Sequence, residues 1–94
     1  ALVALALVPA SARAWSLQGH MATGLLAHDV LARRSPALLA EVERLMAHHP
    51  DRARFEANLR GLRGAERTRW LLAWMARWPD DARRGPFDRP LWHY

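Results

Sequence analysis

Three short stretches of the sequence place metal-capable atoms beside residues that begin or end helices. The first is SARAWSLQGH, in which Trp15 follows Ala-Arg-Ala and His20 comes five residues later. If the chain is cut after Ala14, the free α-amino group of Trp15 has a pKa of about 8 and gives up its proton readily to a metal. Together with its own carbonyl oxygen it can close a five-membered chelate, and a helix begun at about Leu17 would turn the His20 imidazole toward the same point.

The other two stretches follow the most aromatic part of the chain. In WPDDAR, Trp78 to Arg83, a proline is followed at once by two carboxylates. A carboxylate beside a wall of aromatic rings is a good zinc ligand, because the low dielectric strengthens its attraction to the metal. In WHY, His93 lies between two aromatic residues, and histidine is the commonest metal ligand. Taken separately, each stretch also fits a structural role, as a helix cap with a surface ion pair or as a packed histidine.

The elements that must position these residues are helices, and no segment shows the alternation of a strand. Apolar residues at helical spacing predict a helix from about Leu17 to Arg34. Ser35 should cap a second helix that begins at Pro36 and stops before Pro50. The weaker pattern between Asp51 and Gly64 predicts a short helix and a turn, because glycines interrupt it. The fold class predicted from these patterns is all-α.

Two apolar faces stand out on the expected helices. On the second helix one face is traced by Leu38, Leu39, Val42, Leu45 and Met46. A last helix is expected from Ala65 to Arg77, and Pro79 should end it. The large side chains of this segment are Trp70, Leu71, Trp74, Met75 and then Trp78. Aromatic stripes at helical spacing most often form core, so this stripe is expected to pack inside. His28, His48 and His49 lack the context of the three stretches, and the pair before Pro50 is expected at a solvated helix end.

The beginning of the sequence is typical of an exported protein. Residues 1–14, ALVALALVPASARA, combine an apolar run, a proline, and alanines at the two positions that a signal peptidase reads before a cut after Ala14. The run is too short to span a bilayer, and the alternative is a buried N-terminal helix. We therefore expect a partial signal peptide and a secreted or periplasmic protein. The sequence begins without methionine and stops after PLWHY, so 15–94 are expected to be the N-terminal portion of a longer domain.

Composition limits how such a domain is held together and what it binds. The chain of 94 residues contains no cysteine, so an exported domain must be held by its core or by metal. All 14 basic residues are arginine, against 9 acidic residues, which gives a net charge of +5. Arginine favours phosphate-bearing partners, because its planar fork binds phosphate oxygens in pairs. Arginine spread along helices is also typical of a solvated face.

Taken in order, the three stretches resemble the first third of the zinc-dependent S-one/P-one nucleases. The resemblance is carried by an N-terminal Trp, a Gly-His shortly after it, a Trp-x-Asp-x-x-Arg behind a long helical stretch, and a His followed by an aromatic residue. It covers Trp15 to Tyr94, except for the loop from His48 to Gly64. It implies a mostly α-helical fold, like that of phospholipase C and P-one nuclease, with three zinc ions in a cleft.

The resemblance also implies the metal ligands. Trp15 matches the mature first residue, whose amino nitrogen and carbonyl oxygen bind one zinc together with the histidine that His20 matches. Asp80 matches a ligand of a second zinc, and His93 matches its partner on that ion. Asp81 remains the alternative carboxylate.

The substrate contacts are implied in the same way. Arg83 matches the catalytic arginine that contacts the substrate phosphate, and Tyr94 occupies the place of an aromatic residue that stacks on a nucleobase. The implied reaction is hydrolysis of single-stranded RNA or DNA to 5′-phosphonucleotides, with water activated by zinc as the nucleophile. We expect a monomer without stable membrane association.

One departure from the family limits these expectations. The remaining ligands of the family commonly lie in H-x-x-x-D pairs, and the 94 residues contain no such pair. The chain by itself is therefore expected to be inactive. Three alternatives remain. The first is a zinc-dependent phospholipase C, which shares the fold and the N-terminal tryptophan, and the second is a non-catalytic, arginine-rich exported fragment. The third is a truncated or decayed gene product without activity.

Overall fold

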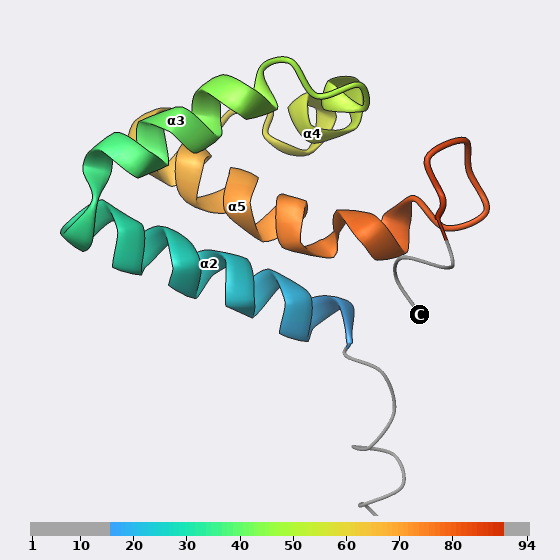
Figure 1. The fold of residues 1–94 in the computed structure, drawn as a ribbon, viewed down its shortest axis with the longest axis horizontal. Coiled ribbons are helices and arrows are strands. Elements are labelled where there is room, and N and C mark those ends of the chain that lie inside the picture. The colour runs from blue at the N-terminus through green and yellow to red at the C-terminus, as the bar shows by residue number, and fades with distance from the viewer. Residues whose placement is uncertain (1–15, 90–94) are drawn as a thin grey trace, which may run out of the picture.

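The computed structural model describes residues 16–89, which form four α-helices and no strand (Figure 1). The helices are α2 at Leu17–Arg34, α3 at Pro36–Met46, α4 at Arg52–Asn58 and α5 at Gly64–Asp81. The predicted all-α class is confirmed for this part of the chain. The expected signal peptide at 1–14, the expected metal ligands Trp15 and His93, and the expected stacking residue Tyr94 all lie outside the described residues.

Two serines set the limits of the first two helices. The Ser16 hydroxyl accepts a hydrogen bond from the Gly19 N–H at 2.9 Å and so caps α2. The Ser35 N–H donates to the Leu31 carbonyl at 2.8 Å, and its hydroxyl accepts from the Leu38 N–H at 3.4 Å. Ser35 therefore ends α2 and caps α3, as predicted, and both bounds of α2 agree with the sequence pattern.

Helices α2 and α5 lie side by side and antiparallel, so α2 begins at the end of the molecule where α5 finishes (Figure 1). Gly24 makes this close approach sterically feasible. A Cβ atom at Gly24 would lie 2.2 Å from the Leu72 carbonyl oxygen, and the adjacent Ala73 is completely buried. Because the two backbones nearly touch, the register between α2 and α5 is fixed at this point.

The core lies between α5 and the α4 region. Its buried members are Phe55, Leu59 and Leu71, and around them pack Met46, Leu62, Trp70, Trp74, Met75 and Trp78. The predicted aromatic stripe of α5 is thus confirmed as core, with the tryptophans partly buried at its edge. The weak segment after Asp51 contains the expected short helix, α4, followed by a turn.

Unlike the stripe on α5, the apolar face predicted on α3 contains no buried residue. No residue of α3 is buried, and Leu38 and Leu45 are 51% and 56% exposed. The helix forms because Ser35 and Pro36 start it, but within residues 16–89 no element covers the outer part of its apolar face.

The expectation that Pro79 ends the last helix is wrong, because α5 continues through it to Asp81. Pro79 lies in the final turn, where the missing N–H removes a single backbone hydrogen bond. Asp80 and Asp81 are consequently helical residues, whereas the sequence analysis placed them after a break. Of the helices between residues 16 and 89, none combines the length and apolar character that crossing a bilayer requires.

Candidate metal and phosphate site

The meeting of α2 and α5 brings two predicted metal ligands into contact. His20, in the first turns of α2, has its Nε2 atom 3.1 Å from Oδ2 of Asp80, in the last turn of α5. The side chains are 25% and 13% exposed, so the pair is largely shielded from solvent. The backbone N–H of His20 donates to the Ser16 carbonyl at 3.0 Å, which fixes the first turn that carries the imidazole.

The second oxygen of the Asp80 carboxylate faces Arg83, the residue predicted to contact the substrate phosphate. Arg83 Nη2 lies 3.3 Å from Oδ1 of Asp80, and the Arg83 side chain is about half exposed. The Asp80 carboxylate therefore lies between an imidazole and a guanidinium group. Three of the residues singled out in the sequence, His20, Asp80 and Arg83, come together at one end of the α2–α5 pair.

The adjacent carboxylate faces another way. Asp81 Oδ1 accepts a hydrogen bond from Arg77 Nε at 2.9 Å, one turn earlier on α5. The Arg77 guanidinium also lies over the Trp74 ring, 4.9 Å from its centroid. Of the two carboxylates that the sequence left as alternatives, Asp80 is the one beside His20, and Asp81 takes part in an intrahelical ion pair.

The position of both carboxylates is electrostatically unusual. The C-terminal end of a helix carries a partial negative charge, so a carboxylate in the last turn is unfavourable by about 0.3–1 kcal/mol. Asp80 and Asp81 both occupy the last turn of α5, which contains no basic residue of its own. The neighbouring cationic groups offset this repulsion, and the same field favours a bound cation near Asp80.

The last turns of α5 are anchored to the loop between α3 and α4. Trp78 Nε1 donates to Oδ2 of Asp51 at 2.9 Å, and this hydrogen bond lowers the pKa of the Asp51 carboxyl. The same oxygen accepts from Arg54 Nε at 2.8 Å. Trp78, two positions before Asp80, is thus hydrogen-bonded to a separate element, which restricts the direction in which the end of α5 points.

His49 takes part in this anchor, and the prediction of a solvated histidine pair is wrong for it. Its ring packs edge-on against Phe55 and Trp78, with centroids 5.2 and 4.8 Å apart, and its Nδ1 accepts from the Asp51 N–H at 2.9 Å. His48 remains exposed. The anchoring role of His49 and Asp51 could not be recognised from spacing, because Trp78, the partner that they share, lies far away in the sequence.

The donor atoms of His20 and Asp80 are of types that bind zinc. Imidazole nitrogen and carboxylate oxygen are both zinc ligands, and four ligands complete a tetrahedral site. Between residues 16 and 89 no group of three or more His, Cys, Asp or Glu side chains could hold a metal ion. His20 and Asp80 fit in type and proximity, and the other predicted donors, Trp15 and His93, are outside the described residues.

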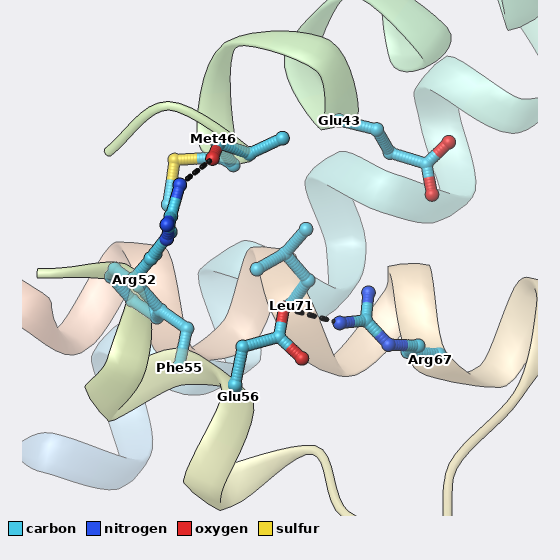
Figure 2. A pocket seen from close by; sticks show the side chains of 8 residues that line it. Glu43, Met46, Arg52, Phe55, Glu56, Arg67 and Leu71 are labelled. Carbon is cyan, nitrogen blue, oxygen red and sulfur yellow. Dashed lines mark hydrogen bonds and ion pairs between the residues drawn. The ribbon is translucent and has the colours of Figure 1, made fainter. Parts of the chain in front are cut away.

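A separate cavity of about 220 Å³ lies between α3, α4 and the first half of α5 (Figure 2). Its polar groups satisfy one another: Arg67 Nη2 donates to Glu56 at 2.6 Å, Arg52 donates to the Ala47 carbonyl at 3.2 Å, and Thr68 donates to Glu43. Its floor is apolar and includes Met46, Phe55 and Leu71. Because its rim is internally paired, this cavity is a packing feature with no group directed at a ligand.

Comparisons with known proteins leave the geometry as the basis for any functional assignment. No protein-family model matches the sequence, and no curated protein and no solved structure matches it.

Proposed function

We propose that this chain is part of a zinc-dependent phosphodiester hydrolase that acts on single-stranded nucleic acid and releases 5′-phosphonucleotides. The observation that carries the proposal is the contact of His20 Nε2 with Asp80 Oδ2 at 3.1 Å, with Arg83 on the other oxygen of that carboxylate. The S-one/P-one resemblance implies that these residues lie around one cleft with three zinc ions, although the first lies in α2 and the others lie at the end of α5 or just after it.

Each residue has a role that follows from its chemistry. His20 Nε2 and Asp80 Oδ2 would each hold zinc, and the α-amino group of Trp15 and the imidazole of His93 would add further ligands. Zinc, when bound, would lower the pKa of water and stabilise the departing oxygen of the phosphodiester. Arg83, half exposed beside Asp80, would donate to the phosphoryl oxygens and stabilise the charge that develops on them. Tyr94 would stack on a nucleobase.

The proposed ligation by Trp15 connects the site with export. An α-amino group becomes available at Trp15 only when residues 1–14 have been removed, and signal-peptide cleavage would remove them. We propose a secreted or periplasmic protein for this reason. His20 follows Trp15 by five positions in the sequence, a separation that would allow both groups to bind one ion.

The test uses the product of the complete reading frame, purified so that Trp15 is its first residue. Zinc content is measured by elemental analysis, and hydrolysis is measured on single-stranded RNA, single-stranded DNA and phosphatidylcholine vesicles. The proposal predicts zinc-dependent cleavage of the nucleic acids, and both zinc content and cleavage should fall in His20→Ala. His48→Ala removes an exposed histidine and serves as the matched control.

Two results would overturn the proposal. Hydrolysis of phosphatidylcholine without hydrolysis of nucleic acid would assign the site to a phospholipase C. Nucleic-acid binding that survives a chelator, with no cleavage, would indicate a non-catalytic arginine-rich protein whose affinity depends on salt.

A further inference from the structure

Arg84 has a backbone conformation that its residue type disfavours. Its φ is 62°, and among residues 16–89 it is the one non-glycine residue with positive φ. The Gly85 N–H donates to the Ala82 carbonyl at 3.1 Å, so 82–85 form a hydrogen-bonded turn with Arg84 as its third residue. Glycine or asparagine usually occupies that place when φ is positive, because a Cβ atom crowds the backbone there.

The loop around Arg84 is held in this strained form. The Arg84 N–H donates to Oδ2 of Asp88 at 2.9 Å, and Arg89 Nη1 donates to the Pro86 and Asp88 carbonyls at 3.3 and 2.8 Å. The hydrogen bond between Arg84 and Asp88 uses the backbone N–H of Arg84 and does not involve its side chain. A glycine at position 84 would keep the same backbone hydrogen bond at lower conformational cost, so the turn itself does not explain the arginine.

Arg84 has an exposed side chain. It follows Arg83 directly, and Arg83 faces Asp80. Between residues 16 and 89 no acceptor receives a hydrogen bond from the Arg84 guanidinium, whereas the nearby Asp88 carboxylate already accepts from the Arg84 backbone. A guanidinium at this place can bind phosphate oxygens in pairs without first breaking an internal ion pair.

We infer that Arg84 binds a substrate phosphate next to the one that Arg83 contacts, and that its strained backbone is kept because this role requires an arginine. The inference rests on the proposed function and makes position 84 part of the nucleic-acid site. The ligand is the phosphodiester backbone of a single strand, recognised without regard to base. Arg84 would position the strand, so its loss should weaken substrate binding and leave the chemical step unchanged.

Arg84→Gly removes the guanidinium and relieves the backbone strain in one substitution. The loss of the guanidinium should weaken substrate binding, whereas the relief of strain should stabilise the fold. In the zinc-loaded protein we expect KM for a single-stranded oligothymidylate to rise about tenfold, with kcat unchanged. For a hydrolysis-resistant phosphorothioate oligonucleotide, the slope of log K against log salt should become shallower by about 0.7, the value for one phosphate contact on a single strand. The denaturant midpoint should rise in the same variant.

Two further variants make the test decisive. Arg84→Lys keeps the charge but loses the fork, so its affinity should fall between those of the wild type and Arg84→Gly. Arg34→Ala removes an exposed arginine from the far end of α2 and should leave KM unchanged. Wild-type affinity and salt slope in Arg84→Gly would overturn the role of Arg84, while failure of the zinc-loaded wild type to bind or cleave the strand would overturn the proposed function with it.

Discussion

The imidazole of His20 and the carboxylate of Asp80 lie 3.1 Å apart, although one residue belongs to the first described helix and the other to the last. The contact exists because α2 and α5 run antiparallel, which places the start of one beside the end of the other (Figure 1). Gly24, one turn after His20, lets the two backbones approach closely and so sets the register of the pair. The candidate site therefore depends on a packing contact that itself carries no chemistry.

Asp80→Asn should lower both zinc content and activity, because an amide is a much weaker zinc ligand than a carboxylate. Loss of a residue next to the ligands commonly costs 10–100-fold, so loss of a direct ligand should reduce the hydrolysis rate by roughly a hundredfold or more. Asp81→Asn is the matched control, since it removes the adjacent carboxylate that pairs with Arg77. Equal losses in the two variants would show that Asp80 has no special role.

An added residue before Trp15 should remove a zinc ion. The proposed ligand is the α-amino group of Trp15, and an extension converts that amine into an amide, which does not bind zinc at neutral pH. Elemental analysis should find one zinc fewer per chain and most activity lost when a glycine precedes Trp15. The same glycine added at the C-terminus serves as the control, and full zinc content in both proteins would exclude the amino terminus as a ligand.

Gly24→Ala should destabilise the protein, although alanine is the better helix former. A Cβ atom would lie 2.2 Å from the Leu72 carbonyl, so α2 and α5 must separate, and overpacking of this kind costs about 1–3 kcal/mol. The free energy of unfolding is measured with urea. Ala22→Gly, at an exposed position of α2, should cost about 1 kcal/mol from helix propensity alone. If Gly24→Ala stabilises the protein, the helices do not approach as described.

The Gly24→Ala variant should also weaken zinc binding, because a wider spacing between α2 and α5 moves His20 away from Asp80. Zinc affinity in Ala22→Gly should stay at the wild-type value. This comparison distinguishes an effect on the register of the helices from a general loss of stability.

Asp29 should make stability depend on pH in acid. Hydrogen bonds from Arg69, at 3.0 and 3.2 Å, and from His28 lower the pKa of Asp29 from 3.8 to about 2. Because folding lowers the pKa of Asp29, the stabilisation by this carboxylate is complete above pH 3.8 and is lost as the pH falls through about 2. Asp29→Asn should therefore be less stable than the wild type at neutral pH, and the difference should shrink between pH 4 and pH 2.

The measurement is urea unfolding of both proteins across that range. Release of zinc in acid affects both proteins alike and cancels in the difference. In an Arg69→Met background, where the main partner of Asp29 is missing, the same substitution should have a smaller pH-dependent effect. A difference that stays constant with pH would show that the ion pair between α2 and α5 does not form.

Local signals determined the helices. Ser16, Ser35 and Pro36 act on backbone groups within one turn, so the bounds of α2 and the start of α3 could be predicted without a fold. The same local reasoning failed at Pro79. The effect of a proline depends on how much helix follows it, and here only the final turn does.

The sequence alone also determined which residue types could bind metal and phosphate, because donor chemistry belongs to the side chain. Only the tertiary structure decided which of them meet. The docking of α2 on α5 placed Asp80 beside His20, while the helical spacing gave Asp81 to Arg77. The contact of His49 with Trp78 likewise came from packing between elements. Such contacts depend on distances across the fold, which no spacing along the chain encodes.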